Sequence, residues 1–114
     1  MLLHLVPLDV WSADPDLPYA PPSLAAEGFV HCSGDEPSAL AVADRYYRDV
    51  PGTLLVLVID ESRLGGEVRW EGSGSSEDVL FPHVYGPIER SAVTEVLEVR
   101  RDAGGRPREL APRA

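Results

Sequence analysis

A histidine and a serine in one short segment are the first residues of this sequence whose types and spacing can do chemistry. In residues 29–33, His31 and Ser33 lie two positions apart. Because side chains alternate faces along a strand, both are expected on one face, and Gly34 then ends the strand. The segment therefore predicts polar groups at the end of a sheet, as in a binding or catalytic site. The alternative is a half-buried histidine that bonds a backbone carbonyl, and the sequence leaves both interpretations open.

Two further histidines lie in segments that are typical of strands, so three imidazoles meet if these strands are neighbours. His4 lies in the opening strand, and His83 shares a strand face with Phe81 and Tyr85. The aromatic and proline-rich stretch around His83 is explained equally by core packing and by a ligand pocket with a few polar groups in an apolar wall. Trp70 and Glu71 leave a similar choice between a stacking surface with a carboxylate and a core residue beside a solvated one.

Metal binding is not favoured by the residue spacing. Cys32 points away from His31 by strand alternation, and the sequence has no His-x-x-x-His or Cys-x-x-Cys pair. Cys32 is therefore interpreted as a small buried hydrophobe rather than a ligand or nucleophile. The helix start after Ser33 is not expected to bind an anion, because Asp35 already places negative charge there and Pro37 has no N–H.

Hydrophobic periodicity predicts the elements that must position these side chains. Strands are expected at residues 2–6, 29–33, 53–59, 67–71, 79–85 and 92–100. Helices are expected at residues 9–13 and 24–27, capped by Asp9 and Ser23, with a longer helix from Asp35 to the Pro51-Gly52 turn. The expected fold is a single α+β domain over residues 1–103, with a mixed, split sheet and two or three short-to-medium helices. Residues 72–78 are expected to form a mobile loop, and residues 104–114 a flexible tail.

Composition limits the classes of partner. The chain has 114 residues, a net charge of -9, and only arginine among its ten basic residues. So acidic a domain repels phosphate backbones, which argues against a nucleic-acid partner. No apolar run is long enough to span a bilayer, and the opening segment is interpreted as a strand rather than a signal peptide. One cysteine fits a reducing cytoplasm, so we expect a cytoplasmic monomer or weak homodimer without a membrane partner.

Several segments taken together resemble the bacterial family named domain of unknown function 952 (DUF952). These segments are Leu3-His4-Leu5, Trp11, Tyr19, residues 27–33, Arg69-Trp70-Glu71 and residues 81–87. In this order they cover roughly residues 1–103. The family is in turn distantly similar to the ADP-ribosyltransferase fold and its RNA 2′-phosphotransferase branch. The resemblance implies a split, curved sheet that holds NAD in a cleft, without a metal.

By chain order, His4 and His31 match the two strand histidines of that branch, which contact the ribose and the nicotinamide side of NAD. The sequence departs from the pattern at Leu5, where a glycine normally follows the first histidine, and Glu71 is only a substitute for the usual late glutamate. The RNA branch also uses phosphate-binding arginines, which an acidic domain supplies poorly.

Two functions of different classes follow. The first is an enzyme, or a remnant of one, that binds NAD or an ADP-ribosyl compound; the second is a non-catalytic module for a small molecule or a protein. In the first, His4 and His31 orient the ribose, and Glu71 or His83 is the acid–base group. The catalytic candidates are His4, His31, Glu71 and His83, and the ligand-binding candidates are Tyr19, Ser33, Trp70 and Tyr85.

Overall fold

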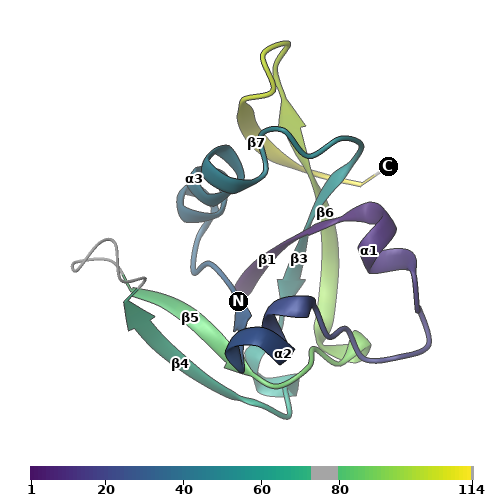
Figure 1. Cartoon of the computed structure of the whole chain (residues 1–114), viewed down its shortest axis with the longest axis vertical. Coiled ribbons are helices and arrows are strands. Elements are labelled where there is room, and N and C mark those ends of the chain that lie inside the picture. The colour runs from purple at the N-terminus through teal and green to yellow at the C-terminus, as the bar shows by residue number, and fades with distance from the viewer. Residues whose placement is uncertain (73–79, 114) are drawn as a thin grey trace.

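The computed structural model describes residues 1–72 and 80–113 (Figure 1). Its most buried strand is β3 (Leu54–Ile59). β3 lies between β1 (Leu2–Pro7) and β6 (Val93–Arg101), and β7 (Pro107–Pro112) follows β6 at the edge of this four-stranded sheet. The continuous apolar run in β3 predicted a strand covered on both faces, and this is confirmed. Leu55, Leu57 and Ile59 enter one core cluster, whereas Leu54 and Val56 enter the other.

A second sheet of three strands carries two of the histidines. Its order is β2 (Val30–His31), β5 (Leu80–Tyr85) and β4 (Glu67–Gly72). The split of the β structure into two sheets agrees with the sequence-based expectation, but the expectation of a mixed sheet is wrong. Every strand pair in the described part of the chain is antiparallel. Parallel neighbours need a long crossover, whereas β6 and β7, for example, are joined by a tight turn.

In the described residues, three α-helices and two short 3-10 helices complete the fold. The α-helices are α1 (Leu8–Ser12), α2 (Pro22–Glu27) and α3 (Glu36–Tyr46), and the 3-10 helices are η1 (Glu61–Arg63) and η2 (Arg90–Ala92). Asp35 caps α3 as expected, because its carboxylate accepts a hydrogen bond from the Ser38 N–H at 2.8 Å. Gly28 ends α2 with a φ of 87°, the left-handed conformation that favours glycine. No helix within residues 1–72 and 80–113 is long and apolar enough to cross a membrane.

Two of the expected helix caps are wrong. Pro7 and Pro21 occupy the cap positions of α1 and α2, and neither helix start has a side-chain cap hydrogen bond. Ser23 lies inside α2, where its hydroxyl donates to the backbone carbonyl of Phe29 at 3.3 Å. A proline at or just before the first turn can begin a helix without a capping side chain, because its fixed φ already suits that turn. The prolines, rather than the aspartate and serine, therefore mark these two helix starts.

The chain also ends differently from the expected flexible tail at residues 104–114. Pro107–Pro112 form β7, which pairs with β6 and places Leu110 against the cluster under α3. This strand was not predicted because its composition is ambiguous. Prolines at both ends with an arginine between them are typical of an edge strand and equally of a flexible tail. The loop predicted at residues 72–78 lies outside the described residues except for Gly72, which ends β4.

Candidate active site at the junction of the two sheets

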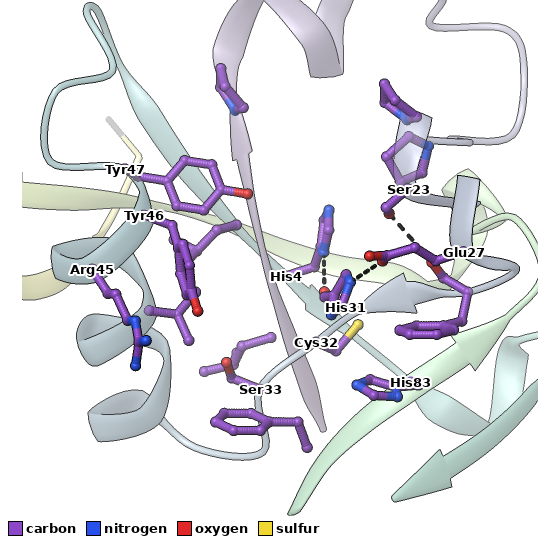
Figure 2. Close-up of a pocket in the computed structure, with 18 of the residues that line it drawn as sticks. His4, Ser23, Glu27, His31, Cys32, Ser33, Arg45, Tyr46, Tyr47 and His83 are labelled. Carbon is purple, nitrogen blue, oxygen red and sulfur yellow. Dashed lines mark hydrogen bonds and ion pairs between the residues drawn. The ribbon is translucent and has the colours of Figure 1, made fainter. Parts of the chain in front are cut away.

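The three histidines meet at the junction of the two sheets, where the strands that carry them are neighbours, which is the condition that the sequence analysis set (Figure 2). His31 on β2 and His83 on β5 are direct cross-strand partners, with ring centroids 5.2 Å apart. His4 on β1 reaches the same place from the other sheet, with its Nδ1 atom 2.5 Å from the backbone oxygen of His31. His4 and His83 are buried, whereas the side chain of His31 is 54% exposed.

The sheets are joined by one pair of backbone hydrogen bonds. Leu3 and Ser33 exchange N–H···O bonds of 2.8 and 2.7 Å. Continuing this antiparallel ladder would pair Leu5 with His31. Instead, the His31 carbonyl accepts from the His4 ring, so the ladder stops and the strands separate.

The open edge that results belongs to β1. Leu8 donates its N–H to the carbonyl of Thr53, the residue before β3. The backbone N–H and C=O groups of the even-numbered residues of β1 therefore face β3, and those of the odd-numbered residues face the junction. The N–H and C=O of Leu5 therefore point toward the junction, and neither has a partner within the described chain. The Leu5 side chain does not cover this edge, because it packs into the cluster under α3.

His4 is a neutral, internally bonded residue. A carbonyl only accepts, so the His4 Nδ1–H donates to His31, and the Nε2 atom accepts from the Tyr19 hydroxyl at 3.0 Å. Burial lowers the pKa of His4 from 6.5 to about 4, which keeps the ring neutral near pH 7. Burial also raises the pKa of Tyr19 above its usual range, so this hydroxyl keeps its proton and donates. With both ring nitrogens satisfied, His4 positions β2 and does not itself face a ligand.

His31 is paired with a carboxylate that sequence inspection did not identify as functional. Glu27, the last residue of α2, accepts from the His31 Nε2–H at 2.5 Å. The left-handed turn at Gly28 lets the chain reverse between helix and strand so that the two side chains meet. The Glu27-x-x-x-His31 spacing was visible, but it is meaningful only once this turn is known. His31 keeps its Nδ1 atom free of partners in the described structure.

His83 belongs to a second carboxylate pair. Its Nδ1 atom lies 2.8 Å from Glu71 Oε1, and the Tyr85 hydroxyl donates to the same oxygen at 2.5 Å. These two bonds hold the pKa of Glu71 below its usual value, with the bond from Tyr85 contributing most, while the pKa of Tyr85 is raised by the same carboxylate. The Phe29 ring stacks on the His83 ring, with the two ring centroids 4.1 Å apart, and this contact fixes the plane of the imidazole.

A cleft of about 960 Å³ runs along the open edge of β1. His4, Tyr19, His31, Ser33 and His83 line it, so five of the predicted site residues are brought together. Tyr85 and Glu71 are not among its lining residues: Glu71 bonds His83, and Tyr85 bonds Glu71 and packs against Phe29, which lines the cleft. Ser33 contributes mainly its backbone, which holds the junction closed.

Trp70 is not part of this cleft. Its side chain is on the opposite face of β4 from Glu71 and lies over Gly34, with 51% of the residue exposed. The interpretation of Trp70 as a core residue is wrong, because half of the residue is exposed. Trp70 is also not among the residues that line the cleft with the histidines.

The opposite wall of the cleft comes from α3 and was missed by the sequence analysis. Arg45, Tyr46 and Tyr47 line it from the last turn of the helix (Figure 2). The spacing of Tyr47 from Ala43 places it on the apolar face of the helix, and it packs into the core there, but nothing in the sequence marked Arg45 and Tyr46 as cleft residues.

Cys32, the residue directly after β2, has a thiol that is expected to be unreactive. Its side chain is buried in the main core, and burial raises the pKa of its thiol to about 12. A protonated, buried thiol is a poor nucleophile and metal ligand. Within residues 1–72 and 80–113, no three His, Cys, Asp or Glu side chains are arranged to hold a metal ion.

Comparisons with known proteins add a family and a fold. A model of the family described as "Protein of unknown function (DUF952)" matches residues 5–96. The crystal structure of protein CC0527 from Caulobacter crescentus is similar, with a TM-score of 0.77, 26% identity, and coverage of 94% of this chain and 92% of that one. A solution NMR structure of CC0527 gives a TM-score of 0.73 at 26% identity, covering 94% and 90%. A search of curated proteins found no match.

Proposed function

Because the chain belongs to the DUF952 family, whose description assigns no chemistry, we propose its function from the cleft: the protein binds NAD or an ADP-ribosyl compound at the open edge of β1. The resemblance of the sequence to the ADP-ribosyltransferase fold belongs to this proposal. The observation that carries it is the unpaired main chain of Leu5, which offers one donor and one acceptor beside two histidine–carboxylate pairs.

A primary carboxamide is the natural complement to the Leu5 edge. It has one N–H donor for the Leu5 carbonyl and one oxygen acceptor for the Leu5 N–H, so it continues the interrupted ladder. Nicotinamide carries such a group on an aromatic ring. Leu5 stands where the RNA 2′-phosphotransferase branch normally has a glycine. It does not block this edge, because the leucine side chain packs under α3.

His31 and His83 supply the polar chemistry of the proposed site. Each has one ring nitrogen held by a carboxylate and the other free of partners in the described structure. In the neutral ring the free nitrogen carries a lone pair, so it can accept a hydrogen bond from a ribose hydroxyl or take a proton. In a transferase, the bond between nicotinamide and ribose breaks with its electrons leaving on nicotinamide, and the negative charge of Glu27 stabilises the cationic sugar. The hydroxyl oxygen of the acceptor then bonds the same ribose carbon, and the proton of that hydroxyl passes to the free ring nitrogen of His31 or His83.

The role of His4 in this proposal differs from that of the first-strand histidine in the RNA 2′-phosphotransferase branch. Its two nitrogens bond His31 and Tyr19, so it does not orient ribose hydroxyls in this arrangement. It is a positioning residue that holds the His31 strand away from Leu5 and keeps the edge open. Tyr19 likewise serves His4 rather than a ligand ring.

A non-catalytic binding module is the second candidate, and the internal bonding of His4 favours it. An enzyme of the resembled type needs this side chain for the substrate, whereas a module needs only the open edge and the cleft. The two differ in one readout, which is release of free nicotinamide from NAD.

The test uses ¹⁵N-labelled protein and three small ligands. We expect nicotinamide and benzamide to shift the Leu5 amide resonance strongly, and nicotinic acid, which lacks the amide donor, to bind at least about tenfold more weakly. His31→Ala should weaken NAD binding, whereas Arg100→Ala, an exposed change on β6, should not. Failure of nicotinamide and NAD to perturb Leu5 overturns the proposal. Nicotinamide release from NAD then separates the enzyme from the module.

A further inference from the structure

The last turn of α3 carries two cleft residues that the function above does not use. Arg45 and Tyr46 line the cleft on the other side of β1 from the histidines (Figure 2). Tyr46 is 64% exposed, an unusual exposure for a large aromatic residue, and the Arg45 guanidinium lies 5.3 Å from the centre of its ring. The two side chains therefore form a joint cationic and aromatic surface inside the cleft.

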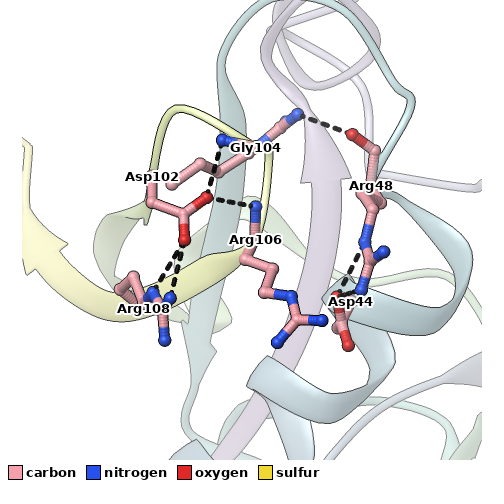
Figure 3. A network of polar contacts seen from close by, with 7 residues as sticks. Asp44, Arg48, Asp102, Gly104, Arg106 and Arg108 are labelled. Carbon is pink, nitrogen blue, oxygen red and sulfur yellow. Dashed lines mark hydrogen bonds and ion pairs between the residues drawn. The ribbon is translucent and has the colours of Figure 1, made fainter.

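Arg45 is free to bind an anion. Its guanidinium makes no hydrogen bond or ion pair with any other described residue, although the chain has an excess of carboxylates. The carboxylate nearest to it in sequence, Asp44, is held by Arg48 through a bond of 2.9 Å from Nε and a second contact from Nη2 (Figure 3). Among the described residues that line the cleft, Arg45 is the arginine and Glu27 is the carboxylate, and Glu27 is bonded to His31. The other lining residues are histidines, aromatic residues and small or apolar residues.

The turn that carries Arg45 is fixed in place rather than loose. Arg101 on β6 donates to the backbone carbonyl of Val50 at 2.8 Å and ties the end of the helix segment to the sheet. Ala43 and Tyr47 on the inner face of the same turn pack into the cluster beneath it. Binding a ligand here would therefore cost little ordering of the backbone.

From these contacts we infer that Arg45 and Tyr46 form a second subsite, which binds the phosphoryl group and the aromatic base of the ligand. The inference rests on the proposed function, because it takes the carboxamide end of that ligand to lie at Leu5. A guanidinium forms charge-assisted hydrogen bonds with phosphate oxygens, and a base stacks on an exposed tyrosine. The ligand class is then a phosphorylated, base-bearing compound that spans β1, rather than free nicotinamide or an unphosphorylated nucleoside.

The test compares ligands that differ only in the phosphoryl part. Dissociation constants for nicotinamide riboside, nicotinamide mononucleotide, NAD and ADP-ribose are measured by calorimetry for the wild type, Arg45→Gln, Arg45→Lys and Arg100→Gln. Arg100 is the matched control, an exposed arginine on β6 outside the cleft with no side-chain partner in the described chain. We expect Arg45→Gln to weaken the three phosphorylated ligands about tenfold or more and to leave nicotinamide riboside unchanged. Arg45→Lys should restore part of the loss.

Each outcome separates this inference from the proposed function. If nicotinamide riboside and NAD bind the wild type and Arg45→Gln changes neither, the second subsite is wrong and the proposed function stands. If ADP-ribose binds in an Arg45-dependent way while nicotinamide riboside does not bind at all, the subsite is supported and the Leu5 proposal fails. Equal weakening by Arg100→Gln would show a nonspecific charge effect and overturn the inference. Absence of all binding overturns both.

Discussion

The His4 imidazole donates its Nδ1–H to the backbone carbonyl of His31 at 2.5 Å, in the place where a continuing ladder would put the N–H of Leu5. A side chain thus substitutes for a backbone donor, and the sheet opens at that point. The substitution satisfies the carbonyl while leaving the Leu5 edge unpaired. One buried histidine therefore both fastens the two sheets together and creates the open edge on which the proposed site depends.

The buried His4 should make stability fall as the pH drops from 7 to 4. Its pKa is about 4 in the folded chain and 6.5 ordinarily, so the unfolded chain binds more protons in this interval. The contribution lost between these two values is roughly 3 kcal/mol. His4→Asn keeps an N–H donor for the His31 carbonyl but does not titrate, so urea unfolding of this variant should depend less on pH. Equal slopes for the wild type and His4→Asn would contradict the prediction.

Tyr19→Phe should destabilise the protein without changing its shape. The substitution removes the hydroxyl that donates to His4 Nε2 and leaves a buried acceptor without a partner. We expect a loss of about 1–3 kcal/mol in the free energy of unfolding. Tyr46→Phe is the matched control, because the Tyr46 hydroxyl has no hydrogen bond within the described residues, and its effect should stay below about 0.5 kcal/mol. Similar losses in both variants would show that the bond to His4 is unimportant.

Tyr85→Phe should raise the pKa of Glu71. The Tyr85 hydroxyl is the first cause of the lowered pKa of this carboxylate, ahead of the bond from His83. Without it, the Glu71 carboxyl should titrate closer to its ordinary value in ¹³C-detected NMR. Tyr47→Phe, on the far wall of the cleft, should leave the titration unchanged. An unchanged Glu71 titration in Tyr85→Phe would show that the 2.5 Å contact does not persist in solution.

The sequence was informative wherever the relevant information is local. Strand alternation placed His31 and Cys32 on opposite faces, and the apolar run in β3 predicted a central strand; both are found. The gathering of His4 and His83 around His31 followed from their strands once these were taken as neighbours. A continuous apolar run or a two-residue period needs no knowledge of distant parts of the chain.

The parts that were missed depend on long-range geometry. The Leu3–Ser33 junction sets where the sheet opens, and no local pattern marks it. Glu27 is a partner of His31 only because of the turn at Gly28, and no local pattern places Arg45 in a cleft that strands from both sheets help to form.

Cys32 should resist alkylation in the folded protein. Burial raises its pKa to about 12, so the reactive thiolate is scarce at pH 8, and the surrounding core excludes the reagent. Iodoacetamide labelling followed by mass spectrometry should be slow in buffer and should rise with urea in step with unfolding. Cys32 is among the residues that line the cleft, so rapid labelling of the native protein would instead show that a reagent in the cleft reaches its thiol, and would reopen a chemical role for it.

Gly66→Ala should destabilise the hairpin that carries Glu71 and His83. A Cβ atom at position 66 would lie 2.7 Å from the backbone oxygen of Tyr85 and 2.9 Å from its carbonyl carbon. Because both atoms are backbone, relief requires moving β5 away from β4, and we expect a cost of about 1–3 kcal/mol in urea unfolding. Gly72→Ala, at the other end of β4, is the control, since its Cβ would meet no described atom within 4 Å. A Gly66→Ala protein as stable as the control would mean that the strands separate there at little cost, and that the hairpin does not hold Glu71 rigidly against His83.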